Sequence, residues 1–412
     1  MKRSGTLLLA AAMIAPALMV LPLSASAQKF DDLAKTPQMG WNSWNRFACN
    51  IDEKLIRETA DAMVKTGLKD AGYQYINIDD CWHGARDASG NIQPDPQRFP
   101  NGIKAVADYV HARGLKLGIY SDVGNTTCGG RPASRGHEYQ DALTYAAWGI
   151  DYLKYDWCDS KNINAVGAYT TMRDALRAAN RPILFSICEW GDNKPWEWAQ
   201  DVGHSWRTTG DIYPCWDCEM SHGSWSALGV LRILDKQAGL RKYSGPGHWN
   251  DMDMLEVGMG MSEDEDRAHF SIWAMMDSPL ILGNDLRNMP KRVHDVVGNR
   301  EVIAINQDPL GVQALRFYNQ GSVELWAKPL ANDEWAFMIL NRGEAPLAYH
   351  YDWQQHTIGD DLSKREADFK KANYSWRDAW SGKSGDTAHR LDVTVPAHGV
   401  VLLRLKKQGD RT

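Results

Sequence analysis

The sequence predicts an α/β protein in which a (β/α)8 TIM barrel precedes a C-terminal antiparallel β-sandwich domain. From residue 38 to about residue 306, short apolar runs alternate with amphipathic helical stretches, which is typical of a parallel sheet. Eight such units can be counted, the number that closes a barrel. After about residue 309 the pattern changes to short alternating runs separated by Gly, Asn, Asp and Pro, which indicates antiparallel strands.

The N-terminal segment, residues 1–27, is predicted to be a signal peptide. Two basic residues near the start precede an apolar run over residues 7–23, and Ala25-Ser26-Ala27 is a small-x-small cleavage signal. The mature chain then begins at Gln28. We therefore expect export to a periplasm or to the outside. Because no later stretch is apolar enough to span a bilayer, no membrane contact is expected after cleavage.

The remaining chain is predicted to divide into a barrel over residues 28–311 and a β domain over residues 312–412. The expected barrel strands cover residues 40–44, 75–79, 115–120, 152–156, 182–187, 204–207, 248–251 and 279–282. The expected helices cover residues 52–67, 103–113, 142–148, 170–179, 228–238 and 267–276. The expected strands of the β domain cover residues 323–327, 334–339, 347–351, 374–378, 391–395 and 399–405. The polar stretch 356–372 receives no assignment.

Composition excludes several classes of function. The net charge is −6 with both signs mixed along the chain, so no basic face for nucleic acid is expected. No glycine-rich phosphate loop is present. The chain has 18 tryptophans and 15 tyrosines, which either fill a core or stack on sugar rings. Seven cysteines in an exported chain indicate disulfides, with one left over if the others pair within the chain.

The predicted strand ends carry polar and aromatic residues. In a barrel of this kind the active site forms at the C-terminal ends of the strands. The residues at or just beyond these ends are Trp44, Asp79, Asp80, Tyr120, Asp122, Asp156, Glu189, Trp190, Arg207, Asp211, Asp251 and Asp253. An acidic pocket lined by aromatic rings suits a neutral polyol such as a hexose and would repel a phosphate.

The stretch Tyr152 to Asp159 contains the clearest candidate for a reacting group. Side chains alternate between the two faces of a strand, so Lys154 and Asp156 are expected to point the same way. A neighbouring cation favours the ionised carboxylate, as a nucleophile in a sugar site requires. The alternative is a buried ion pair that only joins strands.

The chain resembles the α-galactosidases of glycoside hydrolase family 27. The matching motifs occur in the family's order over nearly all of the mature chain. They are Thr36-Pro37-Gln38-Met39-Gly40-Trp41-Asn42-Ser43-Trp44, Ile78-Asp79-Asp80-Cys81-Trp82, Asp95-Pro96-Gln97-Arg98-Phe99-Pro100, Leu115-Lys116-Leu117-Gly118-Ile119-Tyr120, Leu153-Lys154-Tyr155-Asp156, Cys188-Glu189-Trp190, Trp249-Asn250-Asp251-Met252-Asp253-Met254 and Ala304-Ile305-Asn306-Gln307-Asp308-Pro309-Leu310-Gly311. The family's fold, a barrel followed by an antiparallel β domain, agrees with the prediction above.

The resemblance implies a retaining hydrolase that releases terminal α-linked galactose, with no metal or cofactor. Asp156 lies at the position of the family's nucleophile and Asp211 at that of its acid/base. The implied substrate-binding residues are Trp44, Asp79, Asp80, Tyr120, Lys154, Glu189, Trp190, Arg207, Asp253 and Met254. The two aspartates would accept hydrogen bonds from the 4- and 6-hydroxyls, Lys154 would reach the 3- and 4-hydroxyls, and Glu189 and Arg207 would lie near the 2-hydroxyl. The aromatic residues and Met254 would wall the pocket.

Substrate choice within the family is expected to favour galactose. Glu189-Trp190 fills the space that relatives specific for N-acetylgalactosamine keep free for the acetamide. The paired Asp79-Asp80 would favour a sugar with a 6-hydroxyl, which L-arabinopyranose lacks. The alternatives are a β-L-arabinopyranosidase, an α-N-acetylgalactosaminidase, or a catalytically inactive galactose-binding protein.

The cysteines are expected to form crosslinks near the pocket. Neighbouring barrel loops suggest the pairs Cys49–Cys81 and Cys128–Cys158, which also match the pairing in the family. For Cys215 and Cys218, just after Asp211, three states remain open: a small disulfide, a redox pair, or half of a zinc site. Cys188 is expected to be a free, buried thiol.

Overall fold

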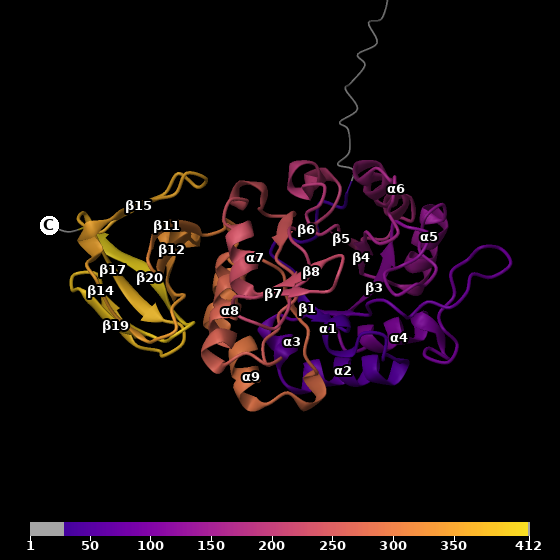
Figure 1. The fold of residues 1–412 in the computed structure, drawn as a ribbon, viewed down its shortest axis with the longest axis horizontal. Helices are drawn as coiled ribbons and strands as arrows, with labels where there is room; N and C mark the ends of the chain where they lie inside the picture. The colour runs from indigo at the N-terminus through magenta and orange to yellow at the C-terminus, as the bar shows by residue number, and fades with distance from the viewer. Residues whose placement is uncertain (1–28, 411–412) are drawn as a thin grey trace, which may run out of the picture.

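The computed structural model describes residues 29–410, so the predicted signal peptide and the mature start at Gln28 lie outside the described residues. Figure 1 shows a barrel of strands and helices with a separate β domain (orange to yellow) against one side. Within residues 29–410, no helix combines the length and the apolar character needed to cross a membrane.

Eight parallel strands form the barrel sheet, as predicted. Their order is β10-β1-β2-β3-β4-β5-β6-β9. The strands are β1 (Met39–Asn42), β2 (Tyr75–Asn77), β3 (Lys116–Asp122), β4 (Tyr152–Asp156), β5 (Leu184–Ile187), β6 (Ser205–Arg207), β9 (Trp249–Asp251) and β10 (Leu280–Leu282). Leu255, beyond the end of β9, joins the two edges: it forms a parallel bridge with Leu282, and its N–H donates to the carbonyl of Ile281 at 2.7 Å.

Helices surround the sheet. They are α1 (Trp44–Phe47), α2 (Glu53–Lys65), α3 (Leu68–Ala71), α4 (Gly102–His111), α5 (Glu138–Trp148), α6 (Ala165–Ala178), α7 (Val230–Gln237), α8 (Glu263–Met275), α9 (Lys291–Val297) and α10 (Arg300–Asn306). Side-chain caps fix where several of them begin. The Asp52 carboxylate accepts from Leu55 N–H at the start of α2, and Ser262 and Glu265 form a capping box at the start of α8.

Two of the predicted strands end earlier than expected. Strand β1 ends at Asn42, because the Asn42 side chain accepts a hydrogen bond from Trp44 N–H at 2.8 Å and the chain turns into α1. Trp44 therefore begins a short helix rather than ending a strand. Strand β2 ends at Asn77, so Asp79 and Asp80 lie in the following loop.

The β domain contains a six-stranded antiparallel sheet and two further antiparallel strand pairs. The large sheet has the order β11-β12-β13-β20-β17-β18, and the pairs are β14–β19 and β15–β16. The strands are β11 (Leu315–Gln320), β12 (Val323–Pro329), β13 (Trp335–Asn341), β14 (Leu347–Tyr351), β15 (Thr357–Gly359), β16 (Glu366–Asp368), β17 (Ala372–Asp378), β18 (Ser384–Asp386), β19 (Leu391–Val395) and β20 (Val400–Asp410). The unassigned stretch 356–372 thus contains the pair β15–β16.

Strand β13 contributes side chains to two hydrophobic cores. All seven of its residues are buried. Ala336 and Met338 belong to the core shared with the barrel, whereas Phe337 and Ile339 belong to the domain's own core. Because side chains alternate along a strand, one face packs on the barrel and the other on the remaining strands of the domain.

A buried ion pair connects the two parts of the chain. Lys328 on β12 pairs with Asp277, which follows α8, and both side chains are fully buried. The ammonium group also donates to the carbonyls of Ala274 and Ile305. Burial raises the pKa of Asp277 to about 7, and Lys328 opposes that rise. Helix α8 accordingly lies between the barrel sheet and the β domain (Figure 1).

Candidate active site

A cavity of about 1060 Å³ opens at the C-terminal ends of the barrel strands. Its size is at the upper end of the range for small-molecule pockets. Eleven of the twelve predicted catalytic and substrate-binding residues line it. These are Trp44, Asp79, Asp80, Tyr120, Lys154, Asp156, Trp190, Arg207, Asp211, Asp253 and Met254.

Asp156 is the last residue of β4, and only 5% of it is exposed. Its carboxylate accepts a hydrogen bond from Trp157 N–H at 3.0 Å. Burial raises its pKa to about 6; nearby Lys154 opposes that rise, and Asp211 and Asp79 add to it. Lys154 favours the ionised form of Asp156, as predicted, but burial has the larger effect on this pKa.

Lys154 connects neighbouring parts of the site. Its ammonium group donates to the Asp79 carboxylate at 2.8 Å and lies 5.2 Å from the centre of the Tyr120 ring. The same oxygen of Asp79 accepts from Asn42 Nδ2 at 2.7 Å. Burial lowers the pKa of Lys154, but Asp79 and the other nearby anions raise it well above its ordinary value. Lys154 therefore stays charged.

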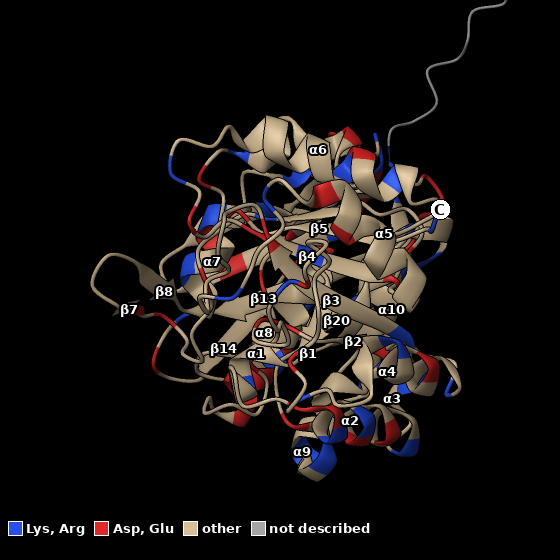
Figure 2. Cartoon of the chain, turned by 90° about the vertical axis from the view of Figure 1, so that its right-hand side faces the viewer, with Lys and Arg blue, Asp and Glu red and all other residues tan. Residues whose placement is uncertain are grey.

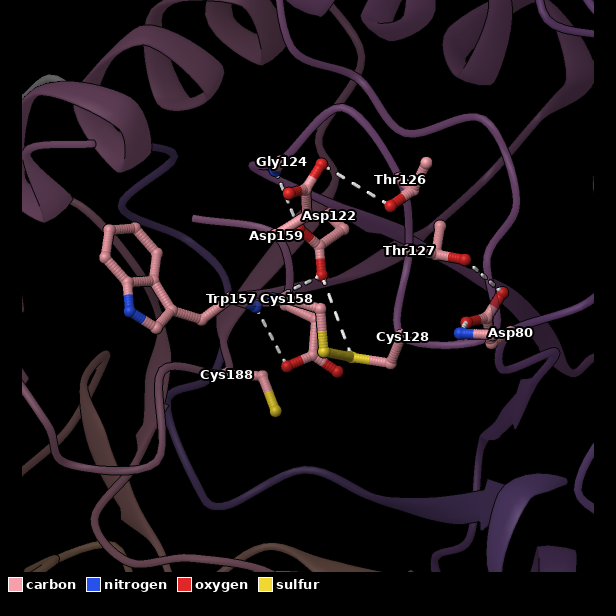
Figure 3. Close-up of a disulfide and its surroundings, with 12 residues drawn as sticks. Asp80, Asp122, Gly124, Thr126, Thr127, Cys128, Trp157, Cys158, Asp159 and Cys188 are labelled. Atoms are coloured by element: carbon pink, nitrogen blue, oxygen red, sulfur yellow. Dashed lines mark hydrogen bonds between the residues drawn. A yellow bond between two sulfur atoms is a disulfide. The ribbon is translucent and has the colours of Figure 1, made fainter. Parts of the chain in front are cut away.

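Asp80 is held by the loop that follows β3. Its carboxylate accepts from Gly129 N–H at 2.6 Å and from Thr127 Oγ1 at 2.9 Å. A disulfide between Cys128 and Cys158 ties this loop to the one after β4, beside the Thr127–Asp80 contact (Figure 3). Burial raises the pKa of Asp80.

Asp122, another predicted strand-end residue, does not line the cavity. Its carboxylate accepts from Gly124 N–H at 2.7 Å and from Cys158 N–H at 2.8 Å (Figure 3). Burial raises its pKa to about 9, and Asp156 adds to the rise. Asp122 therefore fixes the loops beneath the site.

Arg207, at the end of β6, binds two carboxylates that line the cavity. Its guanidinium group pairs with Asp253 at 2.9 Å and with Asp211 at 3.1 Å, and it is almost fully buried. Asp253 also accepts from Ile212 N–H at 2.8 Å, next to Asp211 in the chain. In contrast to Asp156, 43% of the Asp211 side chain is exposed.

Glu189 is the predicted site residue that does not line the cavity. It is fully buried, and its Oε2 accepts from Asn193 N–H and Nδ2, both at 2.7 Å. Its Oε1 has no hydrogen-bond partner in the described protein. Burial raises its pKa to about 7, and the Asn193 contacts oppose the rise.

Several residues beside the site have a positive φ without being glycine. Among them are Cys81, Trp190 and Asp253, with φ of 73°, 57° and 80°. Such angles cost about 1–3 kcal/mol each and persist only where the surroundings enforce them. All three lie within the first few loop residues after a barrel strand; Trp190 and Asp253 line the cavity, and Cys81 forms the disulfide with Cys49.

Several residues that line the cavity were not predicted from the sequence. Glu256 lines the cavity next to Asn45, which donates to it. Tyr213, His222 and Trp225 come from the segment after Asp211, which contains a hairpin of β7 (Glu219–Ser221) and β8 (Ser226–Leu228). The glycine between these short runs is the signal that could have predicted the hairpin.

Comparison with known proteins identifies the family. The family model described as alpha galactosidase A matches residues 36–308, and the model of the alpha galactosidase C-terminal beta sandwich domain matches residues 320–405. The chain belongs to the α-galactosidase family. An α-galactosidase A of Cellvibrio japonicus is 66% identical over 387 residues, covering 94% of this chain and 96% of the relative.

Solved structures of α-galactosidases have the same fold. The α-galactosidase I of Mortierella vinacea superposes with a TM-score of 0.85 at 38% identity, covering 93% of this chain and 100% of that one. An α-galactosidase of Saccharomyces cerevisiae, solved with raffinose, gives 0.86 at 32% identity, covering 92% and 99%. The family and the enzyme class suggested by the motifs are therefore confirmed, and the chain is an α-galactosidase.

The cysteines of this α-galactosidase pair as the barrel loops suggested. Cys49–Cys81 and Cys128–Cys158 are disulfides with Cα separations of 5.2 and 5.1 Å. Of the three states left open for Cys215 and Cys218, the structure has the disulfide. Among the described residues, Cys188 is a free, buried thiol, as predicted.

The Cys215–Cys218 loop is fastened to the start of α7. Gly229 N–H donates to Cys218 O and Val230 N–H to Cys215 O, at 2.8 and 3.0 Å. A Cβ at Gly229 would lie only 2.8 Å from Cys218 N, so no larger residue fits there without a shift. The disulfide thus stabilises a short loop just after Asp211.

Opening this loop is expected to change catalysis more than stability. The ring is small, so the entropic stabilisation of the fold is small, whereas a small misplacement of a catalytic group costs on the order of a hundredfold in rate. We predict that Cys215→Ser/Cys218→Ser lowers turnover or alters the preference for the leaving group, with melting temperature nearly unchanged. Steady-state kinetics and thermal melts measure both. A large fall in melting temperature with unchanged kinetics would contradict this.

Proposed function

We propose that this enzyme releases terminal α-linked D-galactose from oligosaccharides or glycoconjugates by a retaining double displacement through a covalent galactosyl–Asp156 ester. The observation that carries the proposal is the contrast between two carboxylates on one cavity. Asp156 is buried beside the Lys154 ammonium group, whereas Asp211 is nearly half exposed. Two carboxylates in different environments are what a nucleophile and an acid/base require.

In the first step the Asp156 carboxylate attacks C1 of the galactose. The bond from C1 to the leaving oxygen breaks, and Asp211 gives that oxygen its proton. In the second step Asp211 takes a proton from water, the water oxygen attacks C1, and Asp156 leaves as a carboxylate. The first step therefore needs Asp156 as a carboxylate and Asp211 in its protonated form.

The remaining lining residues are proposed to recognise the sugar. Asp79 and Asp80 would accept hydrogen bonds from the 4- and 6-hydroxyls, and Lys154 would donate to the 3- and 4-hydroxyls. Both carboxylates are already held by protein donors, so they are fixed before the sugar arrives. Arg207 would lie near the 2-hydroxyl, whereas Glu189 does not line the cavity and would support its wall through Asn193. Trp44, Tyr120, Trp190, Asp253 and Met254 would complete the wall of the pocket.

We further propose that the mature enzyme is exported. Three disulfides in residues 29–410 support an oxidising compartment. The two family models, which end at residue 308 and begin at residue 320, support a catalytic barrel over residues 28–311 and a β domain over residues 312–412.

Hydrolysis of chromogenic glycosides tests the proposed function. Wild-type protein is expected to release nitrophenol fastest from p-nitrophenyl α-galactoside, compared with the β-L-arabinopyranoside and the N-acetyl-α-galactosaminide. Asp156→Asn should lose turnover, because an amide is a poor nucleophile. A wild-type protein that binds galactose without releasing nitrophenol would instead indicate a binding protein. Faster release from either of the other two glycosides would reassign the substrate.

The pH profile is expected to report the ionisation of Asp156. The nucleophile acts as a carboxylate, and burial raises its pKa to about 6, so activity present above that pH is lost as the pH falls through it. Since kcat/KM reports the free enzyme, its acid limb should have a midpoint at about pH 6. Circular dichroism at each pH serves as the control for folding. A kcat/KM that stays flat from about pH 7.5 to about pH 5 would contradict the assignment.

Loss of Asp211 is expected to depend on the leaving group. Asp211→Ala should slow substrates with poor leaving groups far more than aryl galactosides with activated ones, because the latter need little protonation. Added azide should partly restore turnover by replacing the water that needs a base. Kinetics on both substrate types, with and without azide, measure this. Equal losses without rescue would move the role to another carboxylate.

A further inference from the structure

The β7–β8 hairpin stands at the mouth of the cavity and is not part of the barrel sheet. Figure 2 shows it at the left edge, projecting away from the barrel. Its base is fastened to the chain around Asp211: Leu228 N–H donates to Asp211 O, and Tyr213 N–H donates to Leu228 O, both at 2.8 Å. The hairpin therefore has a fixed position relative to the proposed acid/base.

The tip of the hairpin presents an aromatic ring to the cavity. Trp225 stacks on His222 with ring centres 4.3 Å apart and an angle of 19°, and both residues line the cavity. His222 N–H also donates to Trp225 O at 2.8 Å across the turn, where Gly223 has a φ of 85°. Trp225 is nevertheless 49% exposed. Half of a large aromatic ring is therefore accessible to a ligand in the cavity.

The chemistry of the reaction determines on which side of the cavity the leaving group lies. The acid/base gives its proton to the leaving oxygen, so the leaving group must lie on the Asp211 side of the galactose. Asp156 lies deep in the cavity and Asp211 is far more exposed. The chain just beyond Asp211 therefore lines the space that the leaving group enters. At about 1060 Å³ the cavity has room for more than one hexose.

We propose that the Trp225 ring, supported by His222, is the binding platform for the first sugar of the leaving group. The proposal rests on the proposed function and specifies its substrate class: oligosaccharides in which α-galactose is attached to a further pyranose. The apolar face of a pyranose stacks on an indole ring, which offers a large apolar surface. The stack on His222 holds the indole before substrate binds, so little ordering cost is added. Tyr213 and Ser224, which also line the cavity, supply hydroxyl groups beside the platform.

A comparison of two substrates with Trp225→Ala tests this inference. Raffinose carries a pyranose on its leaving side, whereas the fluoride of α-galactosyl fluoride is too small to reach the hairpin. The variant is expected to lower kcat/KM for raffinose about tenfold, mainly through KM, relative to its kcat/KM for the fluoride. Trp225→Phe should recover part of the loss, because it keeps a flat aromatic ring.

Met220→Ala is the matched control. Met220 lies on β7 of the same hairpin and is 38% exposed, but it does not line the cavity. It should leave the ratio of the two substrates unchanged. An unchanged ratio in Trp225→Ala would overturn the proposal, and so would equal losses on both substrates, which would mean that Trp225 only supports Asp211. Failure of the wild-type protein to cleave either substrate would refute the proposed function instead.

Discussion

The ammonium group of Lys154 is the charge on which the arrangement of the cavity depends. It donates to Asp79, and it opposes the rise that burial imposes on the pKa of Asp156. Without it, two almost fully buried carboxylates would lack compensation, and leaving a buried charge unpaired costs about 3–5 kcal/mol. Strand β4 places Lys154 two residues before Asp156 on the same face, and its ammonium group contacts Asp79 in the loop after β2.

A disulfide, hydrogen bonds and ion pairs hold the other charged groups of the site in a fixed geometry. The Cys128–Cys158 disulfide and Asp122 tie together the loops that follow β3 and β4. Arg207 does the same on the other wall through Asp253 and Asp211. A site that gathers like charges is unstable by itself, so its position must be imposed by the barrel sheet below it and by these crosslinks.

The sequence was informative where one physical rule dominated. The eight strands and the location of the site followed from alternation of strands and helices and from polar residues at strand ends, and the shared motifs gave the lining residues. The rest depended on contacts distant in sequence. Nothing in the sequence pattern near Trp44 shows that the Asn42 side chain accepts a hydrogen bond from Trp44 N–H, where a helix begins. The Asn193 contacts behind Glu189, and the stack of His222 on Trp225, are likewise tertiary features.

The β domain also contributes to the catalytic side of the molecule. His398, in the turn between β19 and β20, stacks on Trp216 with ring centres 5.5 Å apart, and Trp216 lies within the Cys215–Cys218 loop. His398 also pairs with Glu265 on α8 at 2.8 Å and with Glu344 at 3.1 Å. Partial burial lowers the pKa of His398, but the two glutamates raise it above its ordinary value.

A continuous chain of contacts therefore runs from the β domain to the chain beside Asp211. His398 stacks on Trp216, which is 6% exposed. Leu231 N–H, at the start of α7, donates to the carbonyl of Trp216 at 3.0 Å. The loop is thus held from three directions, by its own disulfide, by α7 and by the β domain. Asp211 is the more exposed of the two proposed catalytic carboxylates, and it needs this support because a solvent-exposed loop would otherwise let it move. The barrel alone would leave one of those three supports missing.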